Sequence, residues 1–122
     1  MSRRVLIVDD SATVRLQVRQ ALAPAGFEVI EASDGQEGIE MIQGDSAIAA
    51  VICDVNMPRK SGLELIEAVK ASGHTAHLPI IVMTTEGQPA LVQRAKAAGA
   101  KGWLVKPFKP NVLVAAMAKL TS

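Results

Sequence analysis

Five short apolar runs, each followed by a stretch with apolar residues at helical spacing, are the feature that most limits the fold of this chain. The runs are rich in β-branched residues and too short for buried helices, so they predict strands. They cover residues 4–8, 27–32, 48–53, 80–83 and 102–105. Strands and helices that alternate in this way form a parallel sheet with helices on both faces, joined by right-handed crossovers.

Two doubly wound α/β folds fit this alternation, the six-stranded dinucleotide fold and the five-stranded flavodoxin-like fold. Five strands in 122 residues favour the second, a (βα)5 fold with strand order 2-1-3-4-5. The length is that of one domain, and the sequence contains no linker and no repeat of fixed period. We therefore expect a single domain over residues 1–122, with no output domain.

The composition argues against several classes of partner. The chain has 13 basic and 12 acidic residues, so no overall field attracts nucleic acid, and we expect no direct binding to it. The apolar run Val5 to Val8 is too short for a signal-peptide core or a membrane span. The single cysteine, Cys53, cannot form an internal disulfide, which is typical of a reducing compartment. We expect a cytoplasmic protein that does not insert into a membrane.

The third run is apolar from Ile48 to Cys53, which indicates a strand buried on both faces. It ends at Asp54, and Met57-Pro58 follows shortly afterwards. Proline cannot donate to a sheet ladder and moves the residue before it to an extended conformation, so the strand must end here. Asp54 is therefore predicted at the carboxyl end of a central strand, the edge where open α/β sheets bind ligands.

Other polar residues come at the ends of neighbouring strands. Asp9 and Asp10 follow the first strand, Thr84 follows the fourth, and Lys106 follows the fifth. In the order 2-1-3-4-5 these strands and the third are adjacent, so we expect the side chains to surround one crevice with Asp54. The second strand, which we expect near the edge of the sheet, contributes no charge to this crevice.

Three carboxylates in one crevice repel one another. Two unit charges about 4 Å apart cost about 4 kcal/mol at an effective dielectric near 20. The purely structural alternative is a buried ion pair between Lys106 and one aspartate, which would leave two acids unpaired. A divalent cation would neutralise all three, and oxygen ligands with open positions suit Mg²⁺.

A magnesium site beside a carboxylate, a lysine and a hydroxyl matches phosphoryl transfer. Asp54 would act as the nucleophile, Lys106 would neutralise phosphoryl oxygens, and Thr84 would donate a hydrogen bond to one of them. The sequence contains no P-loop, so we expect the phosphoryl group to arrive on a donor and not from ATP bound to this chain.

From about Arg4 to Leu120, the sequence resembles the response-regulator receiver domains of two-component signalling, in particular the single-domain, CheY-like chemotaxis type. The motifs that carry the resemblance are VLIVDDS, ICDVNMPRKSGLEL, PIIVMTTE and AGAKGWLVKPF, which start at residues 5, 52, 79 and 98. The resemblance implies a phosphorylation-dependent switch. Such a protein catalyses its own phosphorylation and dephosphorylation but is not a conventional enzyme.

The resemblance also implies roles for single residues. Asp54 would accept a phosphoryl group from a histidine kinase, and Lys106 would contact that group and precede a cis peptide bond to Pro107. Asp9, Asp10, Asp54 and the backbone carbonyl of Asn56 would hold Mg²⁺.

Further residues would transmit the signal or set its duration. Thr84 and Trp103 would be the switch residues, although Tyr or Phe is commoner than Trp at the second position. Asn56 and Glu86 would tune dephosphorylation. The segment 59–61 (Arg-Lys-Ser) is more basic than is usual in the family, which could alter contacts with a kinase or phosphatase.

The expected downstream partner is a motor-switch or phosphorelay component in chemotaxis or motility. It would bind the surface of the fifth strand and the last two helices.

Two alternatives to a switch fit the sequence less well. A Mg²⁺-dependent phosphohydrolase also uses an aspartate nucleophile, but such enzymes usually carry it on the first strand with a second acid two residues later. Here Asp9 and Asp10 are adjacent and Ser11 follows. A flavin carrier is disfavoured because the three aromatic residues are few and the acids repel a phosphate.

Overall fold

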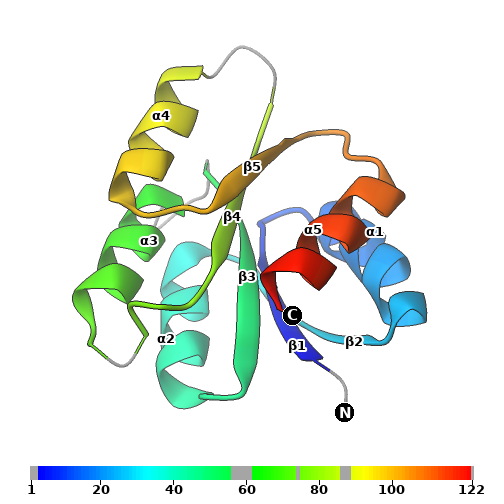
Figure 1. The fold of residues 1–122 in the computed structure, drawn as a ribbon, viewed down its shortest axis with the longest axis horizontal. Coiled ribbons are helices and arrows are strands. Elements are labelled where there is room, and N and C mark those ends of the chain that lie inside the picture. Colours follow the sequence, from blue (N-terminus) through cyan, green and yellow to red (C-terminus); the bar gives the residue numbers. More distant parts are fainter. Residues whose placement is uncertain (1–2, 56–61, 74, 86–88, 122) are drawn as a thin grey trace.

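The computed structural model describes residues 3–55, 62–73, 75–85 and 89–121. A five-stranded parallel sheet in the order β2-β1-β3-β4-β5 lies between two layers of helices (Figure 1). This confirms the predicted flavodoxin-like class and strand order. The strands are β1 (Arg3–Val8), β2 (Phe27–Ala32), β3 (Ile48–Asp54), β4 (Ile80–Thr84) and β5 (Gly102–Val105).

Helices α1 and α5 cover one face of the sheet, and α2, α3 and α4 cover the other (Figure 1). No helix within the described ranges has both the length and the apolar character needed to cross a membrane. The helices are α1 (Ala12–Leu22), α2 (Gly35–Gly44), α3 (Gly62–Ala71), α4 (Pro89–Ala98) and α5 (Pro110–Leu120), and a short 3₁₀ turn, η1 (Ala23–Ala25), follows α1.

Local sequence signals explain both ends of the first helical segment. The hydroxyl of Ser11 accepts a hydrogen bond from the backbone N–H of Val14 and so caps α1. Gly26 follows η1 with φ of 95°, a left-handed conformation that glycine adopts without a steric penalty. The chain can therefore turn sharply from α1 into β2, which lies at one edge of the sheet as predicted.

Each face of the sheet carries its own apolar layer, and β3 contributes to both. Ala50 and Ile52 pack in the layer beneath α1 and α5, whereas Val51 and Cys53 pack beneath α2 and α3. Because β3 has strands on both sides and helices on both faces, no position from Val51 to Cys53 can hold an exposed polar residue. This explains why the run is apolar without alternation.

Two helices on the α2–α3–α4 side show how the helical layer packs on the sheet. In α4 the buried residues are Val92 and Ala95, and Leu91 is half-buried. Helix α2 continues through Gly38, although glycine weakens helix propensity. A Cβ at Gly38 would lie 2.9 Å from both Leu65 and Val8, so the absent side chain is what allows α2 to approach α3 and β1.

Candidate functional site

The register of the sheet brings the predicted polar residues to the same level. The residues before Asp9 and Asp54 pair directly across β1 and β3. Asp54 pairs with the residue before Thr84, and Thr84 pairs with the residue before Lys106. Since the strands are parallel, all four residues lie at the carboxyl edge of the sheet, as the sequence predicted.

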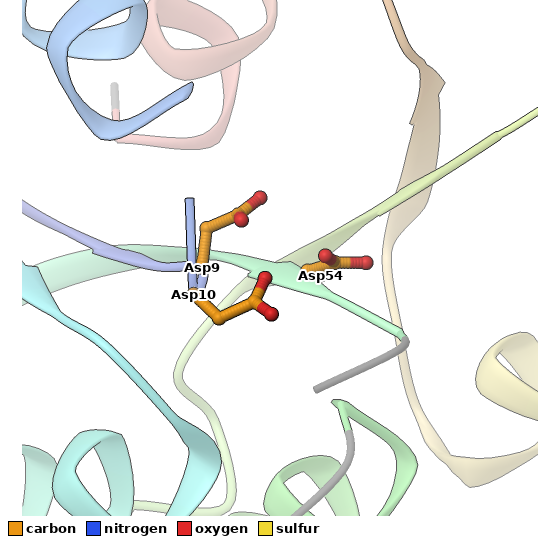
Figure 2. Close-up of side chains that lie close together, drawn as sticks. All are labelled: Asp9, Asp10 and Asp54. Carbon is orange, nitrogen blue, oxygen red and sulfur yellow. The ribbon is translucent and has the colours of Figure 1, made fainter. Parts of the chain in front are cut away.

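Three carboxylates gather at this edge, from the ends of β1 and β3 (Figure 2). Asp9, Asp10 and Asp54 each offer an oxygen, and these oxygens lie within 4.8 Å of one another. Asp9 has an exposed fraction of 0% and Asp54 of 6%, whereas Asp10 is exposed. The cluster therefore has a buried floor and one acid open to solvent.

Lys106 lies between the two buried acids. Its Nζ is 2.8 Å from Oδ2 of Asp9 and 3.0 Å from Oδ2 of Asp54. Burial lowers the pKa of Lys106, but the two carboxylates outweigh it and hold the pKa above its ordinary value. The assumption that one lysine would leave two acids unpaired was therefore wrong: the ammonium reaches both buried acids, and Asp10 alone of the three has no ion pair with a described residue.

The charge on the buried carboxylate of Asp9 is only partly compensated by its neighbours. Burial raises its pKa, and this effect exceeds the opposing one of Lys106 and the backbone N–H of Ser11. Oδ1 accepts that N–H at 2.9 Å. Oδ2 has the ammonium of Lys106 as its partner, and Lys106 is shared with Asp54. A buried oxygen in this condition, within a set of carboxylates open on one side, fits a hard divalent cation such as Mg²⁺.

Replacing Asp9 with Asn should stabilise the protein in a chelator and reduce its stabilisation by Mg²⁺. The amide removes a buried charge beside Asp54 and keeps an acceptor for the N–H of Ser11. We expect a gain of roughly 0.5–2 kcal/mol in the free energy of unfolding, measured by urea denaturation in EDTA. Asp10→Asn is the matched control: because Asp10 is exposed, it should reduce the Mg²⁺ effect with little change in EDTA. A loss of stability for Asp9→Asn in EDTA would contradict the prediction.

The two predicted switch residues lie on the same face of the sheet, because Trp103 pairs with Val82, two residues before Thr84, but they differ in exposure. Thr84 is buried, and its hydroxyl donates to the carbonyl of Thr85 at 3.1 Å. Trp103 is 45% exposed, and the Nζ of Lys96 lies 4.0 Å from its ring centroid. A cation at this distance over an indole face is attracted by the ring, so Lys96 favours the outward position of Trp103.

Three predicted features fall in segments between the described ranges. Asn56, expected to bind magnesium and to tune dephosphorylation, lies outside the described residues. So do Glu86, expected to tune dephosphorylation, and the basic segment 59–61. The predicted cis peptide bond between Lys106 and Pro107 is confirmed.

Two contacts near these residues were missed by sequence reasoning. Arg15 donates to the backbone carbonyl of Asp9, and Lys96 packs on Trp103. The first joins a helix to the strand before it, and the second joins α4 to β5. Neither contact follows from a motif. Lys96 and Trp103 are only seven residues apart, on consecutive elements joined by a turn, and this short separation is the one sequence signal that could have indicated their contact.

Comparison with known proteins agrees with the family resemblance of the motifs over nearly the whole chain. Residues 5–118 match the family model of the response regulator receiver domain. The sequence is 40% identical to the chemotaxis protein CheY1 of Helicobacter pylori over 111 residues, 90% of each chain. It is 41% identical to the transcriptional regulatory protein PdtaR of Mycobacterium tuberculosis over 116 residues, 94% of this chain and 55% of that protein. The solved structure of the chemotaxis response regulator CheY4 of Vibrio cholerae has a TM-score of 0.90 at 40% identity, covering 98% of this chain and 99% of that one.

Proposed function

The chain belongs to the response regulator receiver domain family, and on that premise we propose that it is a phosphorylation-dependent switch whose phosphoacceptor is Asp54. The observation that carries the proposal is the contact of the nearly buried Asp54 carboxylate with the ammonium of Lys106, beside Asp9 and Asp10. A nucleophile, a fixed positive charge and a set of oxygen ligands are the parts that phosphoryl transfer to a carboxylate requires.

In the proposed reaction, a carboxylate oxygen of Asp54 attacks the phosphorus of a phosphohistidine on a histidine kinase. The P–N bond breaks, the leaving nitrogen keeps the electron pair and takes up a proton, and an acyl phosphate forms on Asp54. Lys106 stays protonated because its neighbours raise its pKa, so its charge is available to a phosphoryl oxygen. Attack of water on the phosphorus later breaks the bond between phosphorus and the Asp54 oxygen, releases inorganic phosphate and restores the carboxylate, and Asn56 and Glu86 would set the rate of that step.

We propose that Asp9, Asp10 and Asp54, together with the backbone carbonyl of Asn56, hold Mg²⁺. When bound, the ion would neutralise negative charge on the acids and on the phosphoryl oxygens. The buried carboxylate of Asp9, whose burial Lys106 offsets only in part, and the exposed carboxylate of Asp10 support this assignment.

Phosphorylation would change the conformation of the partner-binding surface through Thr84 and Trp103. The hydroxyl of Thr84, which donates to a neighbouring carbonyl in this structure, would turn to the phosphoryl group, and Trp103 would move inward from its exposed position. Large apolar side chains are also exposed at Val105 on β5 and Val112 on α5. We propose that β5, α4 and α5 bind the downstream partner in the cytoplasm, and the chemotaxis relatives favour a motor-switch or phosphorelay component.

Labelling by a small acyl phosphate tests the reaction. In the presence of Mg²⁺, acetyl phosphate should add one phosphoryl group per chain, through a bond that hydroxylamine cleaves, and a chelator should prevent the addition. Fast multiple turnover of a phosphoester would instead support the phosphohydrolase alternative.

Partner capture tests the switch separately from the chemistry. Beryllium fluoride with Mg²⁺ mimics the phosphoryl group, so the immobilised protein should retain its partner more strongly with this mimic than without it. Equal retention in both states would mean that Asp54 does not control partner binding.

A further inference from the structure

The side chain of Arg15 links the first helix to the ends of two strands beside the acid cluster. Its Nη1 donates to the backbone carbonyl of Asp9 at 2.6 Å, and its Nε donates to Oε1 of Glu31 on β2 at 3.0 Å. The side chain is 18% exposed, so both contacts are largely shielded from water. One guanidinium therefore holds the end of β1 against β2 from the side of α1.

The carbonyl that Arg15 binds belongs to the peptide unit between the two acids. A peptide unit is planar, so fixing the carbonyl oxygen of Asp9 also fixes the direction in which the chain enters Asp10. Asp9 is held in addition by its own N–H, which donates to the carbonyl of Ala32 at 3.1 Å, and by its carboxylate, which accepts from Ser11. These two bonds orient Asp9 itself, whereas the bond from Arg15 orients the link to Asp10.

Glu31 fixes the guanidinium that makes this bond. It accepts from Arg15 and, through Oε2, from Nε and Nη2 of Arg19 at 3.0 and 2.6 Å. Arg19, followed by Arg15, lowers the pKa of Glu31, so the carboxylate stays charged at neutral pH. Hydrogen bonds from a charged donor are shorter and stronger than neutral ones, which suits a clamp on a single carbonyl.

We propose that Arg15 is a positioning residue for the magnesium site, acting through the Asp9–Asp10 peptide unit and not by contact with the ion. The inference rests on the proposed function, because it assumes that Asp9 and Asp10 bind the cation together. Without the clamp, the peptide unit can rotate, and the exposed Asp10 carboxylate is no longer held beside the buried one. Residues that orient metal ligands in this way typically change metal affinity by 10–100-fold when they are replaced.

Arg19 supplies a matched control. Arg15→Met and Arg19→Met each remove one guanidinium from Glu31, and both leave an unbranched apolar side chain on α1. In the structure only Arg15, of these two arginines, reaches Asp9. A general loss of packing or of positive charge should therefore change the Mg²⁺ affinity of both variants alike. A loss of positioning should lower the Mg²⁺ affinity of Arg15→Met alone.

The test is a titration with Mg²⁺ alone, followed by the amide signals of Asp9, Asp10 and Ser11 in NMR spectra. We expect the dissociation constant to rise about tenfold for Arg15→Met and to change less than about twofold for Arg19→Met. The urea midpoints of the two variants in EDTA should be similar. Arg15→Lys, which keeps the charge but lacks the forked donors, should bind Mg²⁺ with an intermediate affinity and serves if Arg15→Met does not fold.

The outcomes separate this inference from the function on which it rests. If the unchanged protein binds Mg²⁺ but the two methionine variants bind it equally well, Arg15 is a structural residue only and the proposal is wrong. Tighter binding by Arg15→Met would also overturn it, because the guanidinium would then act as a repelling charge. If the unchanged protein does not bind Mg²⁺, the proposed metal site and this inference fail together.

Discussion

Asp54→Asn is expected to reduce phosphoryl incorporation from acetyl phosphate by about a thousandfold or more, the scale on which removal of a nucleophile acts. The amide nitrogen has no lone pair available for attack on phosphorus, and the neutral oxygen is a poor nucleophile. The remaining acids cannot replace it, because Asp9 has no exposed surface at which a donor could react, and Asp10 makes no ion pair with Lys106 among the described residues. Radiolabel or mass spectrometry of the intact chain measures the effect.

A loss of labelling has meaning only if the variant folds. Asp54→Asn removes one of three neighbouring carboxylates, so its free energy of unfolding in EDTA should equal or exceed that of the unchanged protein. Asp34→Asn is the matched control: Asp34 is also a buried acid after a strand, but it caps α2 by accepting from the N–H of Glu37 at 2.8 Å. Asparagine caps equally well, so labelling should be unchanged. Undiminished labelling of Asp54→Asn would place the phosphoacceptor elsewhere.

The position of Asp54 could be predicted because several independent sequence signals agree on it. The uninterrupted apolar run of β3 identifies a central strand, and the strand count selects the order that places β1 and β4 beside it. Parallel pairing then brings the strand ends to one edge without any knowledge of side-chain packing. Hydrophobic pattern and topology therefore determine where the site lies.

The detailed electrostatics of the site could not be predicted in the same way. Whether the ammonium of Lys106 meets one acid or two depends on ångström-scale register and on the course of its side chain. The same holds for Arg15, whose bond to Asp9 depends on how α1 packs against the strand ends. Gly38 is a further example, since its low helix propensity is outweighed by the close approach of α2 to Leu65.

Trp103 illustrates the limit of the family resemblance. The resemblance locates a switch aromatic on β5 but does not say what holds it in place. Here the ammonium of Lys96 on α4 lies over the indole ring. Unlike the pairing of two strands, a contact between a helix and a strand has no fixed register from which it could be predicted. Such contacts depend on the residues that happen to face each other in this chain, so only the structure can reveal them.

Gly62→Ala is expected to cost about 3 kcal/mol in the free energy of unfolding, at the upper end of the range for overpacked sites. Gly62 is buried at the start of α3, and a Cβ there would collide with the carbonyl oxygen of Asp54 and lie 2.9 Å from the Cα of Val55. Both are backbone atoms at the end of β3, so no side-chain rotation relieves the clash. The phosphoacceptor must shift, and phosphorylation of the folded fraction should slow by about tenfold, because a displacement near 1 Å can cost a hundredfold.

Two other glycines provide a graded control for this prediction. A Cβ at Gly38 would meet the side-chain ends of Leu65 and Val8 at 2.9 Å, and these can move, so Gly38→Ala should cost about 1 kcal/mol. A Cβ at Gly44 meets nothing within 4 Å, and alanine there should be neutral or stabilising by up to about 1 kcal/mol. Urea denaturation should therefore rank the variants Gly44→Ala, Gly38→Ala, Gly62→Ala in falling stability. If Gly62→Ala were as stable as Gly44→Ala and labelled at the normal rate, α3 could not lie as close to the backbone of Asp54 as the structure places it.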